Sequence, residues 1–276
     1  MNVFQLIRSV LDELYKRIPI ETAKKDKLIN AQIKSLSKTY AKLSKEAPKT
    51  NYADDITRFA YIYEYVTSHA NVVYQIVRDC AALRKIFDAP QVTVTCIGGG
   101  PGSDFLGILK YILKNKKTPS LKVNLFDKEP AWSESWSDVD DKLGLSISNR
   151  FMLFDVTKAE TWKPYDKFLS ADLFTMIYFV SEISTLHDEA EPFFKHLLEN
   201  AKQGALLLYV DNRNQDFYGW FDSLISSHNW KVLMSDQVNL IIEDTNEEKK
   251  DLEPYYSKFP DPKLRANIAY RVCQKQ

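Results

Sequence analysis

Apolar and polar positions divide the chain into two parts of different texture. Up to about residue 87, apolar residues recur three or four positions apart and no strand-like alternation interrupts them, which is the pattern of helices with one buried face. One such stripe contains Leu6, Val10, Leu11 and Leu14, and a later one contains Tyr61, Tyr65, His69, Val72 and Val73. We therefore expect residues 1–90 to form an all-helical N-terminal region, with helices over 23–44 and 54–68 and helix continuing or resuming up to residue 84.

From residue 91 onward, short β-branched runs alternate with amphipathic stretches. This alternation is typical of a parallel sheet that helices cover on both faces. Strands are expected at 92–97, 121–126, 148–154, 173–179, 205–210, 230–238 and 267–273, and helices at 104–114, 133–143, 186–201 and 217–227. The predicted fold class is thus α/β, with a seven-stranded, mostly parallel sheet in a domain spanning 91–276. The polar charge run 243–251 predicts a solvated loop between the last two strands.

Composition narrows the function classes. Lysines plus arginines and aspartates plus glutamates balance at 37 each, so tight, unassisted binding to a polyphosphate backbone is disfavoured, and the lysines between residues 24 and 45 are expected to form a solvated helix face. No apolar run is long enough for a membrane span, and the N-terminus lacks the order of a secretory signal, so we expect a cytoplasmic protein without a membrane partner. The cysteines Cys80, Cys96 and Cys273 are too widely spaced for a metal site and are expected to be buried thiols.

The most informative segment is a glycine-rich turn between the first predicted strand and the helix after it. It reads Gly98, Gly99, Gly100, Pro101 and Gly102, after a strand that ends at Ile97 and before a helix that begins near Asp104. Glycines let a ligand approach the backbone, and the following helix N-terminus offers free N–H groups. A dinucleotide fingerprint would need a glycine at position 103, which is Ser103, so a nicotinamide-dependent oxidoreductase is disfavoured. A purely structural turn remains the alternative.

Two aspartates follow the next two predicted strands. Asp127 ends the run LKVNLFD, and Asp155 ends the run NRFMLFD. Each aspartate alone is more often a turn former or a helix cap. Together they fall at the carboxyl edge of the sheet, where open α/β sheets bind their ligands.

The order of glycine turn, first acid and second acid resembles the class I S-adenosylmethionine-dependent methyltransferases over about residues 91–273. The resemblance implies a seven-stranded sheet with an antiparallel last strand and S-adenosylmethionine as cofactor. The glycine turn would contact the methionine part, Asp127 the ribose, and Asp155 with Val156 the adenine. Lys128, next to Asp127, would also contact the cofactor. One departure is Cys96, which stands where the family often has an acid, and Asp104 is the candidate to replace that acid.

The segment after the fourth predicted strand, ADLFTMIYFVSEI, would face the transferred methyl group. Its candidate catalytic residues are Tyr178, Ser181 and Glu182, with Tyr178 also touching the cofactor and Glu182 the possible base. Alternatively, Tyr178 packs in the sheet and Glu182 caps the next helix. Further candidates, each weighed against core or turn packing, are Trp132 and Trp136 beside the adenine, Asp211, Asn212 and Arg213 at the substrate pocket, and Phe217, Tyr218, Trp220 and Phe221, for which core packing is favoured.

The sequence thus predicts methyl transfer from S-adenosylmethionine to an unidentified acceptor, with RNA slightly preferred over a small molecule or a protein. No Asn/Asp-Pro-Pro-Tyr segment and no paired catalytic cysteines occur, and no histidine spacing suggests a metal. A weak similarity to ribosomal small-subunit-associated methyltransferase-like proteins gives the preference for RNA. The helical region 1–90 would act as a lid or acceptor platform. The alternative is a methyltransferase-like binding or scaffold protein without catalysis, which Cys96 motivates.

Overall fold

The computed structural model describes residues 2–43, 45, 50–136, 142–143, 146–242 and 246–276. Its centre is a seven-stranded sheet in the order β3-β2-β1-β4-β5-β7-β6. The strands are β1 Gln91–Ile97, β2 Ser120–Asp127, β3 Ile147–Leu153, β4 Leu173–Ile177, β5 Leu206–Asn212, β6 Trp230–Ile241 and β7 Arg265–Lys275. Strands β1 to β5 pair in parallel, while β7 runs antiparallel to both β5 and β6. The predicted α/β fold class is confirmed, including the reversed last strand.

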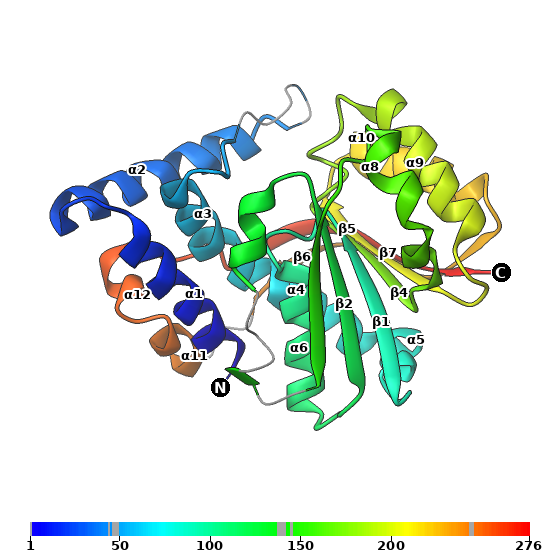
Figure 1. Ribbon diagram of the computed structural model, residues 1–276, viewed down its shortest axis with the longest axis horizontal. Helices are drawn as coiled ribbons and strands as arrows, with labels where there is room; N and C mark the ends of the chain where they lie inside the picture. Colours follow the sequence, from blue (N-terminus) through cyan, green and yellow to red (C-terminus); the bar gives the residue numbers. More distant parts are fainter. Residues whose placement is uncertain (1, 44, 46–49, 137–141, 144–145, 243–245) are drawn as a thin grey trace.

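Alternate side chains of the sheet enter two separate apolar cores, because successive residues of a strand point to opposite faces. On β4, Leu173 and Ile177 belong to one core, and Phe174 and Met176 belong to the other. The first core includes residues of α4 Thr67–Asp79 and α6 Ser103–Lys114, and the second includes residues of α9 His187–Asn200 and α10 Gln215–Ser226. Phe217 and Phe221 are buried in the second core, as favoured from the sequence. The sheet is therefore covered on both faces (Figure 1).

The N-terminal region is helical, as predicted. Its helices are α1 Val3–Arg17, α2 Thr22–Tyr40, α3 Asp55–Tyr61, the π-helical turn η1 Ile62–Val66, α4, and α5 Ala81–Ile86. Figure 1 shows α1, α2 and α3 gathered with α11 Asn246–Asp251 and α12 Tyr255–Lys258 at one end of the molecule. One buried apolar cluster runs from α1 through α4 and α6 to the sheet, and the domain division at residue 90 stays a prediction. Among the helices within the described ranges, none has both the length and the apolar character to cross a membrane.

Three expected elements differ in the structure. The helix expected at 133–143 is instead a short 3-10 helix, η2 Pro130–Glu134, and residues 137–141 lie outside the described part. The charge run 243–251 was expected to be a loop, but its described residues 246–251 form the helix α11. Partners on α1 and α6 bind its side chains: Gln5 donates a hydrogen bond to Asp251 (3.2 Å), and Lys110 pairs with Glu248. Strand β4 ends before Tyr178, whose φ of +55° does not continue an extended strand.

Candidate functional site: a cleft at the carboxyl edge of the sheet

The glycine turn connects β1 to α6 by a sharp change of direction. Gly98 and Gly102 have φ values of +69° and +80°, which favour glycine. Side chains also fill the space beneath the turn, because a Cβ atom on Gly98 would lie 2.2 Å from the Phe179 ring and one on Gly102 would lie 2.6 Å from the Trp136 ring. The turn is therefore restricted to glycine at both positions by conformation and by packing.

Asp127 ends β2 directly beside this turn. Its Oδ2 accepts a hydrogen bond from the Gly100 N–H (3.2 Å), and its Oδ1 accepts one from the Glu129 N–H (2.9 Å). Removal from bulk water raises the pKa of Asp127 to about 6, although both N–H donors act against this shift. Each carboxylate oxygen has a further lone pair, so Asp127 can accept two more hydrogen bonds from a ligand.

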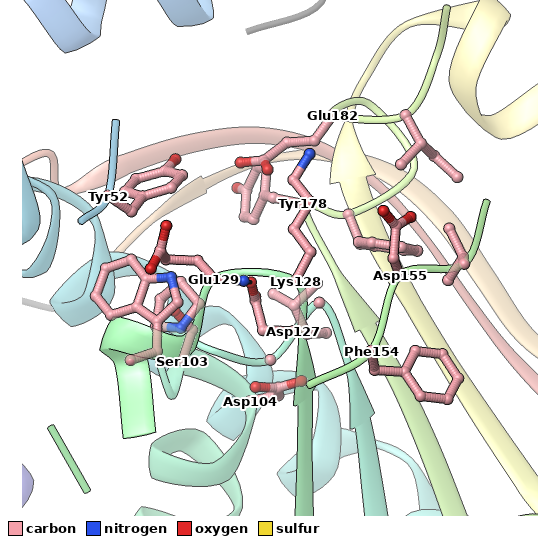
Figure 2. A pocket seen from close by; sticks show the side chains of 18 of the residues that line it. Tyr52, Ser103, Asp104, Asp127, Lys128, Glu129, Phe154, Asp155, Tyr178 and Glu182 are labelled. Atoms are coloured by element: carbon pink, nitrogen blue, oxygen red, sulfur yellow. Dashed lines mark hydrogen bonds between the residues drawn. The ribbon is translucent and has the colours of Figure 1, made fainter. Parts of the chain in front are cut away.

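Asp155 follows β3 and forms a turn at a position that also lines the cleft. Its Oδ1 accepts hydrogen bonds from the Thr157 N–H (3.0 Å) and the Thr157 hydroxyl (2.7 Å), which is the geometry of an Asx turn. Asp155 and Val156 also line the same cleft as Asp127. Figure 2 shows Asp155 and Tyr52 on opposite sides of this cleft, with Asp127 between them.

The cleft, including the space at its open mouth, encloses about 870 Å³. Most of the candidate residues line it: Gly98, Gly99, Pro101, Asp104, Asp127, Lys128, Asp155, Val156, Tyr178 and Glu182. Gly100, Gly102 and Ser181 do not line it; the two glycines pack against neighbouring side chains, and Ser181 lines a second cavity described below. The lining contains five carboxylic acids and a single lysine: Asp104, Asp127, Glu129, Asp155, Glu182 and Lys128. The cleft therefore favours a ligand with positive charge.

Tyr178 lies where β4 gives way to the loop that carries Glu182. Its N–H donates to the Val210 carbonyl (2.7 Å), which holds the residue in its left-handed conformation. Its ring stacks on the imidazole of His69, with 3.8 Å between centroids and 18° between planes. A tyrosine in this backbone region is strained, and such strain clusters at ligand-binding sites. The Tyr178 ring belongs to the first apolar core and also lines the cleft.

Glu182 contacts the N-terminal region. The Tyr40 hydroxyl donates to Glu182 Oε1 (3.2 Å), and Tyr40 also shares a hydrogen bond with Tyr52. Burial is the main reason why the pKa of Glu182 rises to about 7, and the nearby carboxylate of Asp127 raises it further. A carboxyl group with this pKa exchanges protons near neutral pH, which suits a general base.

Asp104 and Cys96 lie under the turn. The Asp104 side chain is buried, and its Oδ2 accepts a hydrogen bond from the Thr175 hydroxyl (2.6 Å). Burial raises the pKa of Asp104, and it also raises that of the Cys96 thiol, beside which Asp104 lies. The three cysteines are buried and free, as predicted.

Sequence reasoning missed several residues of the cleft. Tyr52 and Tyr61 reach the cleft from the helical region. Spacing placed Tyr61 on a helix face, and Tyr52 precedes the helix expected at 54–68. The sequence could have indicated Glu129 as a cleft residue, because it lies only two positions after Asp127, the last residue of β2. Of the tryptophans expected beside the adenine, Trp132 lines the cleft and lies 5.2 Å from Tyr52 and 5.9 Å from Tyr61 between ring centroids.

A second cavity of about 310 Å³ adjoins the cleft, and its lining includes Tyr61 and Tyr178, which also line the cleft. The other lining residues are Tyr40, Leu43, Tyr65, His69, Ser181, Asn212 and Lys263. The predicted shared helix face of Tyr61, Tyr65 and His69 is therefore confirmed. Asn212, expected to border the substrate pocket, lines this cavity, whereas Asp211 is buried and accepts a hydrogen bond from the Ser181 N–H (2.8 Å).

No family model matches the sequence, and neither does any curated protein. Among solved structures, the 16S rRNA methylase ArmA is 12% identical over 88% of this chain and 98% of its own, with a TM-score of 0.46. The [4+2]-cyclase SpnF is 12% identical over 74% and 81%, with a TM-score of 0.47. TrmN from Thermus thermophilus is 15% identical over 78% and 53%, with a TM-score of 0.44.

The strand order and the reversed β7 decide the fold. The chain has the class I methyltransferase fold. Proteins that share a fold can differ in chemistry, so the function has to be argued from the site itself. Within the described ranges, no three His, Cys, Asp or Glu side chains are grouped so that they could hold a metal ion.

Proposed function

We propose that this protein is an S-adenosylmethionine-dependent methyltransferase. The observation that carries the proposal is the acidic lining of the cleft beside the glycine turn, with five carboxylic acids and one lysine among its described residues. S-adenosylmethionine is cationic at its sulfonium centre, so such a lining attracts it. A nicotinamide dinucleotide would bring a negative pyrophosphate to the same place, and the same lining would repel it.

The residues of the cleft fit this cofactor. The N-cap residue of α6, Gly102, offers no side-chain acceptor, and the Phe105 N–H donates to Asp104 Oδ1 (3.3 Å). The N–H group of Ser103, at the start of the helix, is our candidate to bind the carboxylate of the methionine part. The remaining lone pairs of Asp127 suit the two ribose hydroxyls, and Asp155 with Val156 lies beyond them for the adenine. Lys128 is exposed and extends over the cleft toward Glu182 in Figure 2.

When bound, the cofactor supplies an electrophilic methyl group. The chain then has to orient the acceptor, exclude water and accept a proton if the acceptor carries one. Glu182 is our proposed proton acceptor, because it lies in the cleft with its pKa near 7. Tyr178 and Tyr61 line the cleft, and aromatic rings attract a cation placed over their faces.

Titration calorimetry with S-adenosylmethionine and S-adenosylhomocysteine tests the proposal. We expect micromolar binding, a free energy of about −8 kcal/mol, for the unmodified protein. Asp127→Asn should weaken it at least tenfold, because an amide replaces one acceptor oxygen. Glu160→Gln, an exposed acid on α8 Ala159–Trp162, is the matched control and should bind as the unmodified protein does. No heat with either ligand, in protein whose melting temperature is normal, would overturn the proposal.

A binding or scaffold protein without catalysis is the second candidate. The observation that favours it is Cys96, a buried thiol in the position where an acid is common in the family. Cofactor binding without methyl transfer to RNA, protein or small-molecule extracts would support this candidate. Transfer of a labelled methyl group to any of them, lost in Asp127→Asn, would exclude it.

A further inference from the structure

The second cavity is lined by aromatic rings and by polar side chains, and two of the latter, those of His69 and Asn212, make no hydrogen bond within the described part of the chain. Tyr61, Tyr65, His69 and Tyr178 form its walls. The rings of Tyr65 and His69 lie 5.7 Å apart between centroids, and His69 stacks on Tyr178 at 3.8 Å. His69 is only 5% exposed and lines the cavity, yet its ring nitrogens bind no group in the described part of the chain.

The polar groups at this cavity can form hydrogen bonds with donors and acceptors on the edge of a flat ring. Burial lowers the pKa of His69 well below its ordinary value, so the imidazole is neutral at pH 7, with one nitrogen as donor and the other as acceptor. The Asn212 side chain lines the same cavity and makes no hydrogen bond to described residues. Lys263, an exposed residue, brings an ammonium group to the lining, 5.7 Å from the Tyr65 ring centroid.

The cavity continues the proposed cofactor cleft. Tyr61 and Tyr178 line both spaces, and Tyr40, which lines the cavity, donates a hydrogen bond to Glu182 in the cleft. A group held in the cavity would therefore meet the cleft at Tyr178 and Glu182. The space of about 310 Å³ includes solvent at the open side of the cavity.

We propose that this cavity binds the methyl acceptor, and that the acceptor is a single planar aromatic ring, of pyrimidine or phenol size, with an ionisable N–H or O–H directed at Glu182. This inference rests on the proposed function and adds the substrate class. The aromatic side chains that surround the cavity favour a flat ring over an aliphatic group. The ammonium of Lys263 at the lining suits a ring that carries an anionic substituent, such as a phosphate or a carboxylate.

The transfer step balances with these groups. The proton of the ring N–H or O–H passes to the Glu182 carboxylate. The lone pair left on nitrogen or oxygen forms the bond to the methyl carbon, and the carbon–sulfur bond breaks with its electron pair remaining on sulfur. The methylated ring and S-adenosylhomocysteine are the products, and Glu182 returns its proton to water.

The test measures binding of defined probes to protein saturated with S-adenosylhomocysteine, by saturation-transfer NMR and calorimetry. The aromatic probes are uridine 5′-monophosphate and 4-hydroxybenzoate, each free in solution, and pentauridylate for a ring held in RNA. The saturated-ring control is 4-hydroxycyclohexanecarboxylate. Asn212→Phe fills the cavity and Tyr65→Leu removes one wall, while Tyr165→Leu, at a tyrosine that is 43% exposed on η3 Lys163–Ser170, is the matched control.

We expect at least one aromatic probe to bind, the saturated ring to bind at least tenfold more weakly, and both cavity variants to lose at least tenfold in probe affinity. Affinity for S-adenosylhomocysteine should stay within twofold in these variants, which also shows that they fold. Binding of pentauridylate without the free probes assigns the ring to RNA. Binding of a free probe assigns it to a small molecule.

The inference is overturned if no aromatic probe binds, if the saturated ring binds equally, or if Asn212→Phe leaves probe affinity unchanged. Each of these outcomes is read with S-adenosylhomocysteine bound, so it leaves the proposed function intact. Failure of S-adenosylhomocysteine itself to bind overturns the proposed function instead, and the inference falls with it.

Discussion

Replacing Glu182 by glutamine measures how much the ionised carboxylate of this residue lowers the stability of the folded protein. The carboxyl group lies in the cleft near Asp127, where ionisation is unfavourable because the charge loses contact with bulk water. Glutamine keeps the shape and an oxygen that can accept the hydrogen bond from Tyr40. It cannot ionise, so the variant avoids the penalty.

The size and sign of the expected stability difference follow from the pKa of Glu182, which rises from 4.5 in the unfolded chain to about 7 in the folded protein. A shift of about 2.5 units corresponds to about 3 kcal/mol at 1.36 kcal/mol per unit. The folded state holds the proton more tightly, so this group lowers stability as pH rises from 4.5 to 7 and lowers it no further above that range. Glu182→Gln should therefore be more stable than the unmodified protein by less than about 1 kcal/mol near pH 5, and by about 3 kcal/mol near pH 8.

Urea unfolding of both proteins without ligand, at half-unit steps from pH 5 to pH 8.5, measures this difference. Asp127 and Asp211, whose pKa values burial raises to about 6, titrate in both proteins and largely cancel in the comparison. Glu189→Gln, at an exposed position on the next helix, is the control and should show no pH-dependent difference. A constant difference between Glu182→Gln and the unmodified protein from pH 5 to pH 8.5 would refute the reasoning.

Three further substitutions test other parts of the structure. Gly102→Ala places a Cβ atom 2.6 Å from the Trp136 ring at φ +80°, so it should lower stability by about 1–2 kcal/mol and S-adenosylmethionine affinity at least tenfold. Thermal melts and calorimetry measure these two quantities, and unchanged values would contradict the packing of the turn. Lys110→Met removes the buried ammonium that pairs with Glu248 and should lower the free energy of unfolding in urea by about 3 kcal/mol. The loss should be smaller in the double variant with Glu248→Gln, and equal losses in the two variants would argue against this pairing. Phe221→Ala, in the core between α10 and the sheet, should cost about 3–5 kcal/mol while cofactor affinity at low temperature stays unchanged, and a parallel loss of affinity would show that this core supports the cleft.

The sequence predicted the strands and most helices because their signals are local. Buried runs such as Val92 to Ile97 alternate with amphipathic helices, and both patterns depend on neighbours within a few positions. The extent of β4 was wrong by two residues because the conformation of Tyr178 depends on its bond to Val210, which lies on another strand. The helix α11 was missed because its stability comes from partners on α1 and α6.

The candidate site shows the same division between local and tertiary signals. Asp127 and Asp155 were found because each follows its own strand, and strand ends meet at one edge of the sheet. Tyr52 and Tyr61 were missed as cleft residues because nothing near them in sequence indicates which part of the sheet their region covers. The ligand roles assigned to the glycine turn and the two aspartates remain predictions that calorimetry can test.

The placement of β7 has a consequence for synthesis on the ribosome. This strand is translated after the other six, yet it lies inside the sheet, between β5 and β6. Until it emerges, β6 has no neighbouring strand and β5 exposes an unpaired edge, and such edges recruit other chains. Because chains begin to fold from the N-terminal side while they are made, the nascent protein passes through a stage in which five parallel strands can assemble but the sheet cannot be completed. A nonsense mutation anywhere between β6 and β7 would leave the chain permanently at that stage and make it a substrate for chaperones and proteases.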